Sequence, residues 1–242
     1  GGFISSTVLR GIKLILVPTT LLSQVDSSIG GKNGINNNFG KNLIGTFYQP
    51  SLVLIDTIFL KSLPRRQIGS GYAEIVKHSL IKNKKNFIWL ERNFQNILNL
   101  KEPFISKAIY ESIKIKSNIV SKDENETLKT NNSRALLNFG HTFGHALEGL
   151  NNYKNTITHG EAVSIGIVIA TKISFYLNYI SKNNLDKIEK HLKLIELPTY
   201  SKEMYSKKIL KFIMQDKKNI KNLIKFVLLK DIGKAFISKG FT

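Results

Sequence analysis

The chain has 242 residues, a formal net charge of +19 and no cysteine. This length suits one large domain, or one domain and part of another, and the absence of cysteine excludes disulfides and thiolate metal sites. The longest apolar run, at residues 162–170, is about half as long as a bilayer span, and no signal peptide is evident. We therefore expect a cytoplasmic protein that has no membrane partner.

The positive charge invites a nucleic-acid interpretation, because clustered lysines and arginines bind phosphate backbones. Here the excess is mostly lysine and is spread along the chain, with only short clusters at residues 82–85 and 217–221. It accompanies heavy use of Asn and Ile, which indicates a general compositional bias. We expect no nucleic-acid partner, although the field would still attract a small anionic substrate.

The first 60 residues show an α/β pattern. Short apolar strands are predicted at residues 12–18 and 52–56, separated by a helix that Thr19 and Thr20 cap and by a Gly/Asn-rich loop at 30–45. Two strands do not form a stable sheet by themselves. We therefore expect residues 1–60 to be the end of an α/β domain, and the chain, which begins Gly-Gly, to be a fragment or a processed product.

The rest of the chain, residues 61–242, is predicted to form a helical domain. Periodic apolar patterns predict helices at residues 64–82, 84–98, 102–121, 134–150, 159–181, 184–195 and 203–215, and a hairpin at 223–238. The expected fold class is thus α/β plus all-α, a Rossmann-like remnant followed by a helical domain.

A polar stripe marks the predicted helix at 134–150. Arg134, Asn138, His141, His145 and Glu148 recur at spacings of four, three, four and three, so on a continuous helix they share one face. Their apolar neighbours indicate a buried helix, and buried polar groups need partners. A metal ion and an anionic, hydroxyl-rich ligand would suit these groups, although a histidine pair at this spacing is more often a surface or satisfied core pair.

Two further segments support the metal interpretation. Thr158 and Glu161 form a capping-box pattern, which places His159 in the first turn of a helix. The helix that Pro64 opens places Glu74, Lys77 and His78 on one face of an apolar stretch. Three ligands of His/His/Glu type with an open fourth position are typical of a catalytic zinc-like site. These patterns do not decide which three residues bind the metal.

The Gly/Asn-rich loop and the residues just before it, from Gln24, carry functional groups of their own. Asp26, Lys32, Lys41 and Asn42 lie among glycines that let backbone amides approach a ligand. Taken alone, a Gly/Asn-rich loop with two lysines is more often just a turn.

In combination and order, six motifs resemble the 3-dehydroquinate synthase family across essentially the whole chain. They are VPTTLLSQVDSSIGGK at 17–32, GKNLIG at 40–45, AEIVK at 73–77, RALLNFGHTFGH at 134–145, HGE at 159–161 and DKK at 216–218. The resemblance implies an N-terminal nucleotide domain and a C-terminal helical domain, with NAD, a divalent metal (zinc or cobalt) and substrate in the cleft between them.

The resemblance also assigns roles to single residues. It implies that Glu74, His141 and His159 bind the metal and that His145 is a non-ligand catalytic neighbour. The residues that match substrate carboxylate and hydroxyl contacts are Lys77, Lys116, Arg134 and Asn138, with Asp26 and Lys32 reaching the same region. Lys217 and Arg10 match phosphate contacts, the arginine across a homodimer interface, and Thr19, Thr20, Lys41 and Asn42 match cofactor-side positions.

The implied reaction converts 3-deoxy-D-arabino-heptulosonate 7-phosphate, a small anionic sugar phosphate, into 3-dehydroquinate in the shikimate pathway. NAD is recycled, so the enzyme class is lyase. The family's glycine-rich pyrophosphate turn has no counterpart in this chain, so most of the NAD site is missing. The alternatives are another sugar-phosphate cyclase, a glycerol-dehydrogenase-like oxidoreductase and an inactive remnant.

Overall fold

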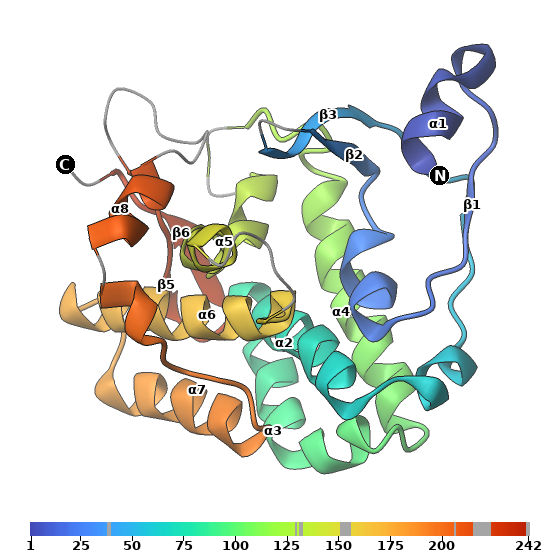
Figure 1. Ribbon diagram of the computed structural model, residues 1–242. Coiled ribbons are helices and arrows are strands. Elements are labelled where there is room, and N and C mark those ends of the chain that lie inside the picture. The colour runs from blue at the N-terminus through green and yellow to red at the C-terminus, as the bar shows by residue number, and fades with distance from the viewer. Residues whose placement is uncertain are drawn as a thin grey trace.

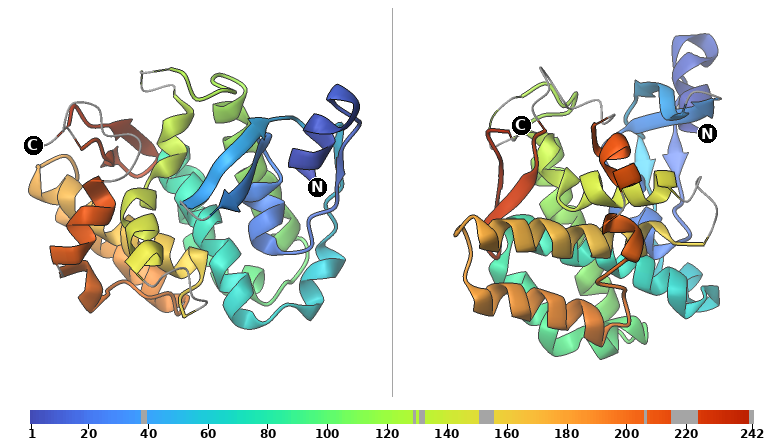
Figure 2. Two further views of the ribbon diagram at one scale, coloured as in Figure 1. Left: turned by 45° about the horizontal axis from the view of Figure 1, so that its top comes forward. Right: turned by 60° about the vertical axis from the view of Figure 1, so that its left-hand side comes forward.

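The computed structural model describes residues 1–37, 40–128, 130, 133–150, 156–205, 207–214 and 224–240. Figures 1 and 2 show a body of packed helices, with the N-terminal segment along one side and two short hairpins at its edges. Similar folds, reported below, bear out the expected class of an α/β remnant followed by a helical part. No helix among the described residues is long and apolar enough to cross a membrane.

The N-terminal segment contains little regular structure. It begins with α1 (Gly2–Thr7) and the 3-10 turn η1 (Val8–Arg10). Strand β1 (Ile15–Leu16) pairs in parallel with β4 (Leu52–Val53), as expected for a remnant of an α/β sheet. Large apolar side chains on this pair are exposed, including Ile15 at 61% and Leu52 at 51%. Between the strands, a helical segment ends in the π-helical turn η2 (Ser23–Ser27).

The Gly/Asn-rich segment is not a loop, so that prediction was wrong. It forms an antiparallel hairpin of β2 (Lys32–Asn37) and β3 (Gly40–Phe47). Close strand approach explains the glycines: a Cβ at Gly45 would lie 2.3 Å from the Asn33 carbonyl oxygen. Composition alone predicts a loop here, because Asn and Gly are depleted in strands.

The helical part is built around α2 (Arg65–Lys82), which follows the 3-10 segment η3 (Thr57–Ser62). All residues from 68 to 81 are buried. Helices α3 (Lys84–Leu98), α4 (Phe104–Val120) and α6 (His159–Tyr176) pack around it. A helix enclosed on every side must satisfy its polar side chains within the protein, so those of α2 face other polar groups.

The remaining elements pack on α6, on α5 or on α2. They are α5 (His141–Leu150), α7 (Lys182–Leu194), η5 (Lys202–Tyr205), α8 (Lys207–Met214) and the predicted C-terminal hairpin, β5 (Val227–Asp231) with β6 (Lys234–Ile237). The hairpin is tied to the helices by the Leu229 amide, which donates to the Ser174 hydroxyl at 3.0 Å. It is also tied by the Gly233 amide, which donates to the Leu80 carbonyl at 2.8 Å.

The predicted continuous helix at 134–150 is broken. Residues Arg134–Asn138 form the 3-10 segment η4, and α5 begins only at His141. Gly140 lies between them with φ +78°, and a Cβ there would lie 2.8 Å from the Ile167 amide nitrogen on α6. The break lets the backbone turn where it touches α6. The polar stripe is therefore divided between two segments, and its members do not share one helical face.

Candidate metal centre and anion-binding groups

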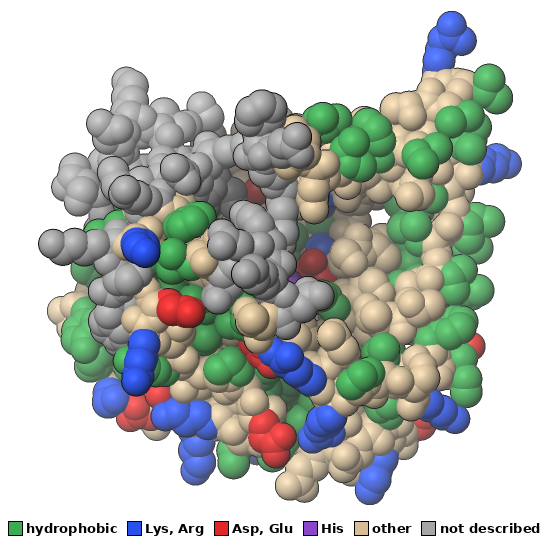
Figure 3. Space-filling model, viewed as in Figure 1, with side chains coloured by type: hydrophobic (Ala, Val, Ile, Leu, Met, Phe, Trp, Pro, Cys, Tyr) green, Lys and Arg blue, Asp and Glu red, His purple; other side chains and the backbone are tan. Residues whose placement is uncertain are grey.

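Helix α2 contributes three buried polar side chains to one cluster. Glu74, Lys77 and His78 are each no more than 1% exposed. Lys77 forms an ion pair with Oε2 of Glu74, three residues earlier on the same helix. Their spacing places all three on the side of α2 that faces α4, α5 and α6, as the sequence predicted. Figure 3 shows acidic and histidine atoms at the bottom of a hollow near the centre of one face.

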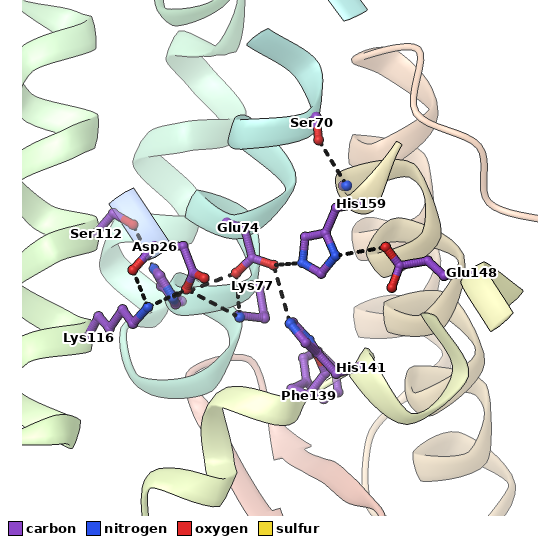
Figure 4. A network of polar contacts seen from close by, with 12 residues as sticks. Asp26, Ser70, Glu74, Lys77, Ser112, Lys116, Phe139, His141, Glu148 and His159 are labelled. Carbon is purple, nitrogen blue, oxygen red and sulfur yellow. Dashed lines mark hydrogen bonds and ion pairs between the residues drawn. The ribbon is translucent and has the colours of Figure 1, made fainter. Parts of the chain in front are cut away.

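Two histidines at helix starts complete a candidate metal group. His141 is the first residue of α5 and His159 the first of α6. Their Nε2 atoms lie 3.7 and 3.5 Å from Oε1 of Glu74 (Figure 4). Two ligand atoms held about 2.1 Å from a tetrahedral zinc ion are about 3.4 Å apart. The three side chains thus have the spacing that a shared ion requires.

The hydrogen bonds of this group also fit a metal. Oε1 of Glu74 is buried and has no hydrogen-bond partner among the described residues. The other nitrogen of each imidazole, Nδ1, faces an acceptor: Glu148 Oε1 lies 3.3 Å from His159, and the Phe139 carbonyl 3.3 Å from His141. The ring of His141 can therefore be protonated at Nδ1 and present an Nε2 lone pair to the centre, and His159 would do so once a metal ion displaced its Nε2 proton.

Their surroundings shift the pKa values of the two histidines in opposite directions. Burial lowers the pKa of His159, but the carboxylates of Glu148 and Glu74 outweigh burial and raise it to about 10. Burial and the nearby Lys77 hold the pKa of His141 well below its usual value. The Lys77 ammonium holds the pKa of Glu74 below its usual value, against the effect of its burial. A carboxylate and one neutral imidazole are the forms that bind a metal ion.

The start of α6 is fixed by several contacts, which set the position of His159. The predicted capping box is present: the Glu161 amide donates to the Thr158 hydroxyl, and the Thr158 amide donates to Glu161. Arg66 on α2 binds both carboxylate oxygens of Glu161 at 2.7 Å. The Gly160 amide donates to the Ser70 hydroxyl at 2.9 Å, and a Cβ at Gly160 would collide with the Ser70 backbone at 2.2 Å.

A second acidic group lies beside the first, but it is already neutralised by lysines. Asp26, Glu74 and His78 also lie within the reach of one ion. However, Lys116 on α4 donates to Asp26 Oδ1 at 2.7 Å, and Lys77 Nζ lies 4.0 Å from the same oxygen. These two cations keep the pKa of Asp26 well below its usual value despite burial. The two ammonium groups would repel an added cation here, whereas they would attract an anion.

His78 is a member of the cluster whose partners the sequence did not reveal. Its Nδ1 lies 2.7 Å from the Ser112 hydroxyl on α4, and its Nε2 lies 3.5 Å from Asp26 Oδ1. Burial lowers the pKa of His78. His78 thus lies between the Ser112 hydroxyl and the Asp26 carboxylate, and its Nε2 makes no hydrogen bond among the described residues.

Three further predicted residues meet at an acidic loop between α4 and η4. Lys32 of β2 forms an ion pair with Glu126, and the Asn138 side chain donates to the other oxygen of Glu126 at 3.2 Å. The Arg134 guanidinium donates to the Glu124 carbonyl at 2.7 Å, and its backbone amide donates to Asp123 at 2.8 Å. The sequence reasoning missed this loop, although its three acids in a basic chain were a usable signal.

The remaining predicted residues lie outside this buried cluster. His145 is exposed on α5, although its ring centre lies 5.1 Å from that of His141. Arg10 is exposed in η1, and no described ion pair joins it to the cluster. Thr20 exchanges hydrogen bonds with Ser23 and caps the following helix, as predicted, while Thr19 is exposed.

Two residues predicted on the cofactor side, Lys41 and Asn42, lie on β3. Lys217, predicted on the phosphate side, is not among the residues that the structure describes. The Asn42 amide donates to the Asn36 side chain at 3.1 Å across the β2–β3 hairpin. Lys41 is the second residue of β3, but its side chain is not among the described atoms.

Comparisons with solved structures support the same architecture. The chain aligns with a 2-deoxy-scyllo-inosose synthase solved with carbaglucose-6-phosphate, NAD+ and Co2+, at a TM-score of 0.84 and 30% identity over 98% of this chain and 65% of that one. A 2-epi-5-epi-valiolone synthase from Streptomyces hygroscopicus, solved with NAD+ and Zn2+, aligns at a TM-score of 0.88 over all of this chain and 66% of that one. At 24% identity, the latter likeness shows the fold alone.

Sequence comparisons identify the family. A profile described as 3-dehydroquinate synthase C-terminal matches residues 71–219, and one described as 3-dehydroquinate synthase N-terminal matches residues 1–70. Proteins named 3-dehydroquinate synthase from Bartonella quintana and Pelagibacter ubique are 47% and 49% identical over 99% and 96% of this chain. The chain spans 64% and 63% of their lengths. The chain therefore belongs to the 3-dehydroquinate synthase family.

Proposed function

We propose that this chain forms the metal- and substrate-binding part of a 3-dehydroquinate synthase. The reaction would convert 3-deoxy-D-arabino-heptulosonate 7-phosphate into 3-dehydroquinate and phosphate. The observation that carries the proposal is the convergence of Glu74, His141 and His159 on one buried centre in a chain of this family. Because the chain spans about two thirds of its relatives, the activity belongs to the longer protein.

The proposed cofactors are NAD and one divalent metal ion, zinc or cobalt. The two related cyclases were solved with NAD+ and with Zn2+ or Co2+, which supports this choice. When bound, NAD accepts and returns a hydride while the metal polarises the ring hydroxyl that is oxidised. Glu74, His141 and His159 would hold the metal, with the fourth position open for substrate hydroxyls.

The two lysines of the cluster would fix the substrate beside that centre. Lys77 and Lys116 lie buried at Asp26, so their charges act at short range and in a low dielectric. Asp26 would accept a hydrogen bond from a substrate hydroxyl, while Lys116 offers its ammonium to the carboxylate. Burial lowers the pKa of Lys116, and Asp26 opposes that shift.

The groups around the acidic loop would position the rest of the substrate. Arg134 and Asn138 would meet its carboxylate and hydroxyls, and Lys32 would reach the same region. His145, exposed next to His141, would hydrogen-bond the reacting atoms without binding the metal. The task of these residues is to hold one flexible intermediate in successive reactive positions.

The other assigned residues would act at the edges of the site. Thr19, Thr20, Lys41 and Asn42 would lie on the cofactor side, and Lys217 and Arg10 on the phosphate side.

We propose a homodimer in which Arg10 reaches the partner's site, which fits its exposed position in η1. A dimer should elute at twice the chain mass, and Arg10→Ala should weaken substrate use without changing metal content.

The test uses the natural protein that contains this chain, supplied with NAD and Zn2+. It should release one phosphate for each 3-dehydroquinate formed, with no net change in NADH absorbance. Net NADH accumulation would instead indicate a dehydrogenase. A metal-loaded protein that leaves this substrate unchanged but closes another sugar phosphate would indicate a different cyclase.

A further inference from the structure

Glu148 has no role in the proposed chemistry, yet it faces the candidate metal centre. It lies on α5, is half-buried, and points to the ring of His159 (Figure 4). Its Oε1 lies 3.3 Å from Nδ1 of His159, and the opposite ring nitrogen, Nε2, faces Glu74 Oε1 at 3.5 Å. His159 thus lies between two carboxylates that contact different nitrogens.

We propose that Glu148 is a positioning residue that fixes the ring and tautomer of His159 and thereby sets the metal affinity of the site. The inference rests on the proposed metal-binding function. A carboxylate that accepts a hydrogen bond from Nδ1–H keeps the proton on Nδ1 and leaves the lone pair of Nε2 available to a metal ion. It also makes the imidazole a more basic, stronger ligand.

The two histidines differ in the group that accepts a hydrogen bond from Nδ1. Nδ1 of His141 faces the neutral Phe139 carbonyl, a backbone group that no side-chain substitution removes. Nδ1 of His159 faces a side chain. Of the two histidines, His159 is therefore the one whose Nδ1 contact a side-chain substitution can remove, at Glu148.

The charge balance of the cluster supports the same assignment. Asp26 and Glu74 carry two negative charges, and Lys77 and Lys116 carry two positive charges, so these four side chains are neutral together. Once a metal ion displaced the Nε2 proton of His159, Glu148 would add a negative charge beside the centre, which favours a divalent cation. Because the site is buried, this charge is weakly screened.

The experiment measures metal affinity directly, by competition with a chromophoric chelator, in the full chain. Glu148→Ala should weaken Zn2+ binding about 10- to 100-fold, the range typical of lost support for a metal-bound histidine. Glu148→Gln keeps an oxygen that can accept from Nδ1, so its loss should be several-fold smaller. With Co2+ bound, the visible spectrum of Glu148→Ala should shift because the ring is free to turn.

The control is Glu189→Gln, which removes one carboxylate from α7, where Glu189 pairs with Lys193 at 2.7 Å. It should leave metal affinity within about twofold of the unchanged chain. Thermal unfolding of each metal-free variant identifies any loss of affinity that comes from unfolding. If Glu148→Ala does not fold, Glu148→Gln decides the question through its affinity and Co2+ spectrum.

Three outcomes would contradict the inference or its basis, and they are distinguishable. Unchanged affinity in a folded Glu148→Ala, while His141→Ala loses the metal, would overturn only the role of Glu148. Equal losses of affinity in Glu148→Ala and Glu148→Gln would show that Glu148 acts through its negative charge and not through the hydrogen bond to Nδ1. Full metal binding by His141→Ala would overturn the proposed metal site itself.

Discussion

At the residue scale, histidines in the same helix have different surroundings and should have different roles. His141 is buried with its Nε2 toward Glu74, whereas His145, one turn later on α5, is exposed. Spacing alone suggests that both bind the metal, since residues four apart share a helical face. The family resemblance separated them, and the structure places only His141 within ligand distance of Glu74 and His159.

The pair provides a matched prediction. His141→Ala removes one of three proposed ligands, so the purified variant should lose its metal, measured by elemental analysis, and its activity. His145→Ala should keep about one metal per chain and still lose most turnover, because it removes only a contact to the reacting atoms. Metal retained in the first variant, or lost in the second, would contradict the proposed division of roles.

His191 illustrates a buried histidine with a structural role. It lies on α7, 2% exposed, with Nε2 3.2 Å from the Tyr72 hydroxyl and aromatic rings of Phe87 and Phe94 at its edges. Burial disfavours the charged ring and lowers the pKa of His191 to about 4. The histidine is therefore neutral in the folded protein at neutral pH.

This burial predicts a pH dependence of stability. The unfolded chain protonates His191 near pH 6.5 and the folded chain near 4, so its contribution is fully present above 6.5 and is lost as pH falls through this window. The full loss amounts to about 3 kcal/mol. Urea unfolding of the metal-free chain between pH 7 and 4 should show this loss, and His191→Gln should lack it. An identical pH slope in both proteins would exclude the assignment.

At the element scale, the sequence predicted which segments are helical better than where they begin and end. Apolar periodicity located α2, α3, α4, α6 and α7, because each buries a face against its neighbours. The capping box located the start of α6 and hence His159. Periodicity did not detect the break between η4 and α5, since a positive φ at Gly140 depends on how close α6 approaches.

In the site, too, residues of one helix could be predicted to lie together, whereas contacts between separate segments could not. Glu74, Lys77 and His78 were expected on one face of α2, and they are together there. Lys116 on α4, Asp26 before the hairpin and Glu126 in the acidic loop come from separate segments, so no local pattern places them together. The family motifs supplied Lys116 and Asp26, but nothing in the sequence indicated that Glu126 contacts Lys32 and Asn138.

Gly140 should be a determinant of stability and metal binding. Gly140→Ala would impose a strained φ of +78° and a Cβ 2.8 Å from the Ile167 amide nitrogen, which together cost about 2–5 kcal/mol. We also expect weaker metal binding, because His141 follows directly. The measurements are urea unfolding and chelator competition.

The control for this variant is Gly69→Ala in the buried interior of α2. A Cβ there would meet only Leu197 Cδ2, at an ordinary 3.8 Å. This substitution should be neutral or stabilise the protein by up to about 1 kcal/mol, because alanine favours a helix. Comparable losses in the two variants would show that the turn at Gly140 has no special requirement for glycine.

At the scale of the whole molecule, a net charge of +19 coexists with a site whose charges are paired. Exposed lysines act through a field that ordinary salt screens over about 10 Å. Lys116 instead lies buried against Asp26. If the basic excess is compositional, substrate recognition should depend on the buried cations and hardly on the exposed ones.

Phosphate release by the natural protein at low and high ionic strength tests this expectation. Lys116→Met should lower kcat/KM by at least about 100-fold at both salt concentrations, since a desolvated, charge-assisted contact is lost. The double variant Lys85→Met, Lys190→Met removes two exposed charges and should lose less than about threefold, and only at low salt. Thermal unfolding must show that Lys116→Met is folded, because Asp26 loses a partner there. Equal losses that vanish together in high salt would mean that diffuse charge holds the substrate and that the buried cluster is not its binding site.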